Sequence, residues 1–98
     1  MVNLKRLFRL RRAILAALLE YSSYQDLDTV MLHPTVIRES ASPEELRVEW
    51  RNLAEWGMTE PLAGYQGAVC RLTAATRQTM EETSNAPRDS RLYGFEVQ

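Results

Sequence analysis

Residues 42–77 read SPEELRVEWRNLAEWGMTEPLAGYQGAVCRLTAATR, and this stretch decides the fold that we expect. It begins with Ser42 and Pro43, which suit the N-cap and the first turn of a helix, and Glu45 completes a capping box. Gly57 supplies the left-handed residue that ends the helix. The buried stripe expected at helical spacing consists of Leu46, Trp50 and Leu53. The first half of the stretch therefore predicts one well-capped helix.

A β-hairpin is expected in the second half of the stretch. Residues 58–62 form a short extended run, in which Pro61 is compatible only with an edge strand or a bulge. Two glycines within residues 63–67 suit a chain reversal. Residues 68–72 alternate in part and supply the second strand. The order of helix, glycine and two-stranded hairpin is that of a wing.

The same stretch resembles a known family. Residues 53–59, LAEWGMT, are followed by the hairpin and then by residues 70–78, CRLTAATRQ, which is similar to the MarR- and PadR-like branches of winged helix-turn-helix proteins. The resemblance extends over about residues 13–83. It departs from the family where Ala75 and Thr76 replace a glycine often seen after the Leu-Thr pair. A shared fold does not by itself transfer function.

The resemblance implies an α+β, mostly helical fold. We expect a winged helix-turn-helix with an N-terminal helical extension and a small wing of two or three strands. Residues 1–83 form the domain, within which residues 1–12 are the extension or a dimer arm. Its last helix is expected at residues 74–83, with Thr73 as the cap. Residues 84–98 are a polar linker and an apolar docking tail, which packs on its own domain or on a partner subunit.

The first helix is expected at residues 2–22, and Arg11 interrupts its apolar side. In one interpretation, the stem of Arg11 lies on apolar surface and its head reaches water or a carboxylate. In the other, residues 13–19 are core and the preceding part is an arm. The residues of this arm that we expect in a homodimer interface are Leu4, Leu7, Phe8 and Arg11.

A second helical segment is expected at residues 24–32. His33 and Pro34 end it, because the residue before proline is pushed out of helical geometry. Residues 35–37 either pair with the wing or begin the turn between helices. The connection of residues 33–41 is long for a helix-turn-helix, and a short helix inside it remains an alternative.

Composition restricts the classes of function. The net charge of −1 gives no general attraction to nucleic acid or anionic membrane. The single cysteine, Cys70, suits a reducing cytoplasm, where we expect the protein. One cysteine and one histidine cannot complete a four-ligand zinc site, so we expect no metal and no cofactor. No catalytic residues are expected, and no segment reaches the ~20 apolar residues of a membrane span.

The first hypothesis of function is a small dimeric regulator of transcription that binds double-stranded DNA. The helix that follows Ser42 would enter the major groove, where arginine and asparagine side chains read base edges. The residues expected to read bases are Arg47, Arg51 and Asn52. The residues expected to contact phosphates are Arg38, Lys5, Arg6 and Arg9.

The charge pattern speaks against that hypothesis. Residues 1–20 carry five basic groups and one acidic group, a balance of +4, whereas residues 38–60 carry three and six, a balance of −3. Glutamates on a helix in the major groove are repelled by phosphates. We expect four of them to be exposed on this helix: Glu44, Glu45, Glu49 and Glu55. The wing of residues 62–69 has no lysine or arginine.

The alternative hypothesis is a winged-helix module that binds proteins and not DNA. Its contacts would come from the acidic helix, the wing or the N-terminal arm. Two aromatic residues bear on this choice, since exposed aromatics favour protein interfaces. Tyr65 is expected at the wing tip. Trp56, just before Gly57, is either exposed or packed beneath the wing as part of the core.

Overall fold

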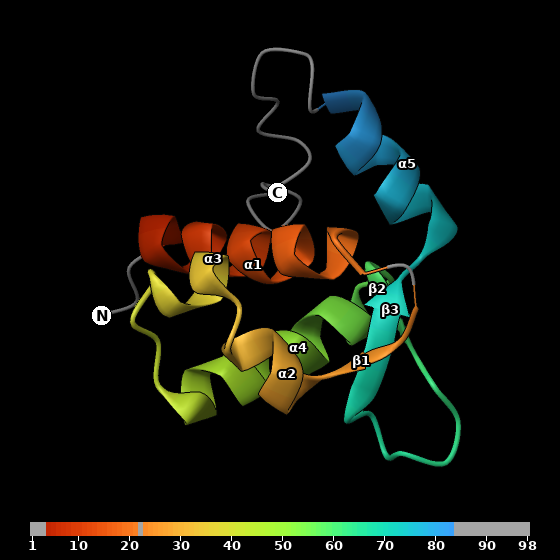
Figure 1. Ribbon diagram of the computed structural model, residues 1–98, viewed down its shortest axis with the longest axis horizontal. Coiled ribbons are helices and arrows are strands. Elements are labelled where there is room, and N and C mark those ends of the chain that lie inside the picture. Colours follow the sequence, from red (N-terminus) through yellow and green to blue (C-terminus); the bar gives the residue numbers. More distant parts are fainter. Residues whose placement is uncertain (1–3, 22, 84–98) are drawn as a thin grey trace.

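The computed structural model describes residues 4–21 and 23–83, which form a mostly helical α+β fold with a three-stranded antiparallel sheet (Figure 1). The helices are α1 (Leu4–Leu19), α2 (Leu27–Met31), α3 (Pro34–Ile37), α4 (Pro43–Glu55) and α5 (Ala74–Thr83). The strands are β1 (Gln25–Asp26), β2 (Thr59–Pro61) and β3 (Val69–Leu72). The predictions for residues 1–3 and for the linker and docking tail, 84–98, lie outside the described residues.

The core forms where α1 crosses the body of the molecule, with α3 and α4 packed against it (Figure 1). The half of α1 from Ala13 onward contributes five buried residues, and Arg11 reaches a carboxylate, as the first interpretation of that residue predicts. Leu10, which is fully buried, extends that core further toward the N-terminus than we predicted. The residues that meet α1 in the core include Val30, Val36, Leu46, Trp50 and Leu53.

Helix α4 begins and ends as the sequence predicts. The hydroxyl of Ser42 accepts a hydrogen bond from Glu45 N at 3.1 Å, and Glu45 Oε1 accepts one from Ser42 N at 3.0 Å. Pro43 occupies the first turn, where its missing N–H is not needed. Gly57 has a φ of 77°, the left-handed conformation that glycine adopts without strain. The local signals at both ends thus fix the length of α4.

The sheet has the strand order β1-β3-β2. The hairpin of β2 and β3 is confirmed, with Thr59 opposite Leu72 and Pro61 opposite Cys70. Because β2 lies at an edge of the sheet, the missing N–H of Pro61 interrupts no hydrogen bond in the centre of the sheet. Thr73 accepts a hydrogen bond from Thr76 N at 3.3 Å and caps α5 as expected. A third strand, β1, joins the other side of β3.

The segment between α1 and α4 differs from our prediction. The expected helix of residues 24–32 is wrong at its start, because Gln25 and Asp26 form β1 and pair with Cys70 and Val69. The helix begins only at Leu27, capped by Asp26, whose side chain accepts a hydrogen bond from Thr29 N. Residues 35–37 belong to α3 and pair with no strand. The alternative of a short helix within residues 33–41 is therefore correct.

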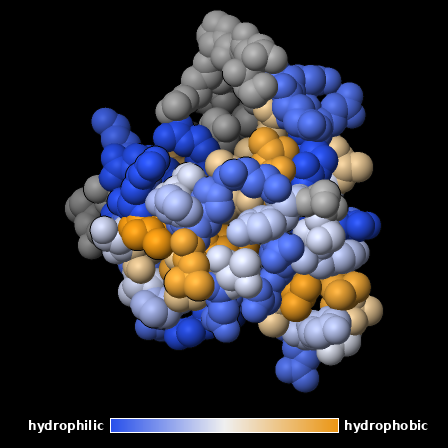
Figure 2. Space-filling model, viewed as in Figure 1, coloured by the Kyte–Doolittle hydropathy of each residue, from blue (hydrophilic) through white to orange (hydrophobic). Residues whose placement is uncertain are grey.

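The described helices include none that is both long and apolar enough to cross a membrane. On the face shown in Figure 2, apolar side chains gather around α2 and α3. The large apolar residues exposed in that segment are Leu32 and Ile37, with exposed fractions of 74% and 56%.

Candidate functional site

Ion pairs join α1 to one side of α4, which we call the inner side. Arg6 pairs with Glu45, and its Nη2 donates to Glu45 Oε1 at 3.0 Å. Arg11 donates from Nε to Glu49 Oε2 at 2.7 Å and from Nη2 to Oε1 at 3.3 Å. The side chains of Arg11 and Glu49 are only 9% and 4% exposed. The expectation that Glu49 is exposed is therefore wrong, because the fold uses its charge to neutralise Arg11.

The guanidinium of Arg6 also controls the titration of its partner. The hydrogen bond from Arg6 is the main reason that the pKa of Glu45 falls to about 2, and hydrogen bonding to Ser42 adds to the effect. The carboxylate therefore stays charged through the physiological range, and the inner side of α4 presents no unmatched negative charge at this point.

Trp50 is buried, as predicted, and Trp56 is exposed, which is one of the two alternatives that we weighed for it. Trp56 is 42% exposed, and the guanidinium carbon of Arg11 lies 4.7 Å from the centroid of its ring. Trp50, not Trp56, lies beneath the hairpin loop: its Nε1 donates to Gly67 O at 2.9 Å. Tyr65 is exposed at the loop, as predicted. The loop is thus fixed to α4 through a buried indole.

An open groove of about 680 Å³ lies between α2, α4 and the loop that joins β2 to β3; we call it the α4 groove. Its apolar lining comes from all three segments: Leu27, Met31, Trp50, Ala54 and Ala68. The volume is within the range of about 300–1,000 Å³ that is typical of ligand sites. Since most of the lining residues are exposed to solvent, the site is a surface groove and not a closed cavity.

The α4 groove has charges of opposite sign on its two sides. Arg47 and Arg51 lie on α4, one helical turn apart, and both are exposed. Asp26 and Asp28 lie at the start of α2. The hydrogen bonds of Asp26 with Thr29 lower the pKa of its carboxyl group, which therefore remains charged. Within residues 4–21 and 23–83, no ion pair connects these two arginines with these two aspartates.

The predicted base-reading set is divided by the helix. Arg47 and Arg51 both line the α4 groove, but Asn52 does not. At 3.6 residues per turn, Asn52 points about 100° away from Arg51. It is half-buried and falls in the same stripe of α4 as Glu45 and Glu49. The structure therefore brings two of the three residues together.

Two of the four predicted phosphate contacts are engaged by carboxylates of the chain itself. Arg6 is engaged by Glu45, and Arg9 Nε lies 3.4 Å from Glu39 Oε1. Lys5 and Arg38 are exposed, on α1 and just after α3, respectively. None of these four residues lines the α4 groove.

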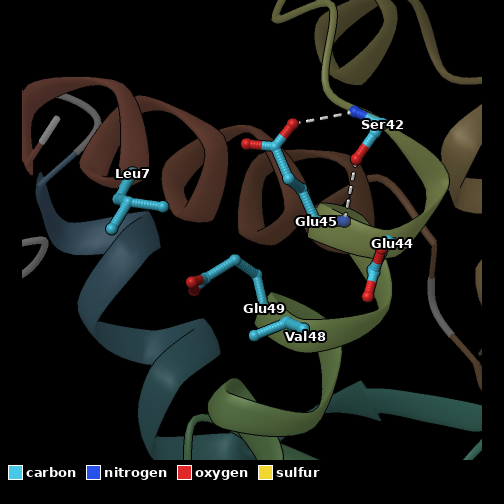
Figure 3. Close-up of a pocket in the computed structure, with 6 residues that line it drawn as sticks. All are labelled: Leu7, Ser42, Glu44, Glu45, Val48 and Glu49. Carbon is cyan, nitrogen blue, oxygen red and sulfur yellow. Dashed lines mark hydrogen bonds between the residues drawn. The ribbon is translucent and has the colours of Figure 1, made fainter. Parts of the chain in front are cut away.

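The predicted dimer residues lie at the N-terminal part of α1. Leu4 is 58% exposed, while Leu7 and Phe8 are half-buried. Figure 3 shows Leu7 on one side of a second, smaller hollow, opposite Val48 and Glu49 of α4. Arg11 differs from the other three because it is buried against Glu49, as described above. Because it is buried, Arg11 would support such an interface by holding α1 against α4 and not by contacting the second copy.

The cysteine and the histidine of the chain are both held by the fold. Burial raises the pKa of the Cys70 thiol, which is 1% exposed and thus a poor nucleophile. His33 pairs with Glu20 through Nε2, and its Nδ1 accepts a hydrogen bond from Thr35 N. No group of three or more metal-binding side chains occurs in residues 4–21 and 23–83.

Sequence reasoning identified the basic side of the α4 groove and missed the acidic side. The sequence predicted a helix over residues 24–32, which includes Asp26 and Asp28 but gives no reason to place them beside α4. The signal that could have found them is Asp26 itself, an N-cap residue type that marks the start of a helix at Leu27. Comparison of the chain with models of known protein families, with curated proteins and with solved structures gave no match.

Proposed function

We propose that the chain is a winged-helix domain, in which the β2–β3 hairpin is the wing and α4 holds the position of the recognition helix. The order of elements supports this proposal: a helix and a short strand precede α2, α3 and α4, and a hairpin follows. The strand order β1-β3-β2 supports it as well, since the first strand joins the hairpin on the side of β3.

We propose further that this domain is a protein interaction module, which binds a segment of a partner protein in the α4 groove. The observation that carries the proposal is the apolar floor of the groove, bordered by two arginines and two aspartates. An apolar centre with a polar border is the usual composition of a protein interface. A phosphate backbone would meet the aspartates as well as the arginines, and like charges repel.

Double-stranded DNA is the second candidate, favoured by one specific observation. Arg47 and Arg51 are exposed one turn apart on α4, and arginine is the residue type that most often reads guanine in the major groove. The burial of Glu49 and the pairing of Glu45 also leave fewer free carboxylates on α4 than the sequence implied. The acidic start of α2 remains the main obstacle to this candidate.

Homodimer formation through α1 is a separate part of the proposal. Leu4 and Val48, which are 58% and 39% exposed, would be covered by a second copy of the chain. Sedimentation at tens of micromolar measures the mass directly. We expect a dimer that becomes a monomer in the variant Leu4→Glu; a monomeric wild-type protein would remove this part and leave the groove proposal intact.

The groove proposal is tested by selection of peptides on the immobilised full chain. A library of random 16-residue peptides is selected in parallel on the wild type, on Ala54→Trp, which fills the groove, and on Arg38→Glu, a matched change outside it. We expect peptides that bind the wild type and Arg38→Glu equally and Ala54→Trp at least about tenfold more weakly. Ala68→Trp fills the groove from the exposed loop and serves if Ala54→Trp does not fold.

Two results decide between the candidates. Failure of any peptide to be enriched, or binding that neither tryptophan variant weakens, would contradict the protein interaction module. A pool of random duplex DNA applied to the same surface at low salt tests the second candidate. Retention whose affinity falls steeply with salt concentration would favour DNA.

A further inference from the structure

The α4 and α2 sides of the α4 groove carry charges of opposite sign, and this difference restricts which partners can bind between them. Arg47 and Arg51 present two positive charges on the α4 side. Asp26 and Asp28 present two negative charges on the α2 side. A uniformly acidic or uniformly basic partner would be attracted by one side and repelled by the other. A complementary occupant carries both signs, separated across its width.

The fold itself makes little use of these charges. Arg47, Arg51 and Asp28 are exposed, and none of them belongs to an ion pair within the described residues. Asp26 uses Oδ1 to cap α2. The arginines of the inner side are different, because Arg6 and Arg11 are held by carboxylates of α4. The groove charges are therefore available to a partner.

The lining of the groove also indicates the conformation of the occupant. Eight of the twelve lining residues come from the sides of α2 and α4, three from the hairpin loop, and only Asp26 from a strand. An occupant therefore meets side chains and not an open strand edge, which favours a helix laid in a groove over an added strand. The stretch of α4 from Pro43 to Ala54 is about 16 Å long, which matches about three turns of helix.

We infer that the α4 groove binds an amphipathic helix of a partner protein, whose apolar stripe is bordered by acidic residues on one edge and by basic residues on the other. The acidic edge lies along Arg47 and Arg51, and the basic edge along Asp26 and Asp28. Because the two arginines are four positions apart, the acidic residues that face them recur at a spacing of three or four. The apolar stripe covers Leu27, Met31 and Ala54.

This inference rests on the proposed function and is tested by reversing the charge of one side. A peptide selected on the wild type is titrated against the full chain carrying Arg47→Glu and Arg51→Glu, and against Arg38→Glu as the matched control. We expect the double variant to bind at least about tenfold more weakly and the control to bind as the wild type does. Changing the acidic edge of the peptide to lysine should restore binding to the double variant.

The outcomes separate this inference from the proposal beneath it. If no peptide is selected, the protein interaction module fails and the inference fails with it. If peptides bind in the groove but lack opposite edges, or the peptide with the lysine edge does not restore binding, the inference is overturned while the module stands. Both substitutions are at exposed positions, so unchanged thermal unfolding of the double variant verifies that the fold is intact.

Discussion

The two sides of α4 hold the same kinds of charged residue and use them differently. On the inner side, Arg6 and Arg11 reach from α1 to Glu45 and Glu49, and the second pair is almost completely buried. On the groove side, Arg47 and Arg51 line the same groove as Asp26 and Asp28, with no ion pair between them in the residues that the structure describes. Charges on the first side belong to the fold, and charges on the second are available for binding.

This difference explains why a count of charges along the helix was misleading. Four glutamates against two arginines indicated an acidic outward surface. The structure removes Glu45 and Glu49 from that surface by pairing them, and it adds two aspartates from α2 that the count did not include. What a partner meets is set by the packing of helices and not by the composition of one of them.

The largest effect that we expect comes from breaking the buried pair. The variant Arg11→Met leaves Glu49 as an uncompensated buried charge, which should lower the free energy of unfolding by about 3–5 kcal/mol. Urea denaturation followed by circular dichroism measures the change. The double variant Arg11→Met, Glu49→Leu is the control, and its stability should return to near that of the wild type. A single variant as stable as the wild type would show that the inner pair does not support the fold.

A smaller effect is expected at the boundary between the two sides. Trp50→Phe removes the indole donor to Gly67 O while keeping an aromatic ring in the core. The lost hydrogen bond should lower the free energy of unfolding by about 1–2 kcal/mol. Hydrogen exchange should quicken at the loop of residues 63–68. As a control, the amides of the first turn of α4 should exchange at the same rate in the variant and the wild type. If the loop is equally protected in both, contacts other than this hydrogen bond hold it.

The loss of stability in acid tests the half-buried pair of Arg6 with Glu45. The pKa of Glu45 is lowered from 4.5 to about 2 in the folded chain, so its stabilising contribution is present in full above pH 4.5 and is lost as the pH falls through 2. Glu45→Gln keeps an acceptor for the capping box but has no titrating group. We expect the variant to lose less stability than the wild type between pH 4.5 and 2, measured by thermal unfolding. If the variant and the wild type lose the same stability between pH 4.5 and 2, the pairing of Arg6 with Glu45 does not stabilise the fold.

The smallest effect on stability is expected on the groove side. Arg47→Ala and Arg51→Ala together should change the free energy of unfolding by no more than about 0.5 kcal/mol for each substitution, because both side chains are exposed and the fold does not pair them. The same denaturation measurement used for Arg11→Met gives a direct contrast between the two sides. A loss of several kcal/mol would mean that these arginines are structural after all.

Local signals made much of the fold predictable. The capping box of Ser42 and Glu45, the stop at Gly57 and the proline of the edge strand each depend on residues close in sequence, and each was found. Strand β1 was missed because its two residues are extended only through their pairing with Cys70 and Val69, more than 40 positions away.

The candidate site was predictable only in part, for the same reason. Exposed arginines on a helix can be identified from spacing, which gave Arg47 and Arg51. Asn52 was grouped with them but does not line the α4 groove, because neighbours in sequence point in different directions on a helix. A carboxylate partner for Arg11 was one of the alternatives, but its identity as Glu49 and the packing of α2 near α4 depend on tertiary structure, which no local pattern reports.

The most direct test of the proposal that the α4 groove binds a protein segment is nuclear magnetic resonance titration of the full, isotope-labelled chain with a selected peptide. We predict that the perturbed amides belong to Leu27, Met31, Arg51, Ala54 and the loop of residues 66–68, with no comparable change along the inner side of α4. Perturbation confined to α1 or α5, or the same groove signals moving with duplex DNA and not with peptide, would contradict it.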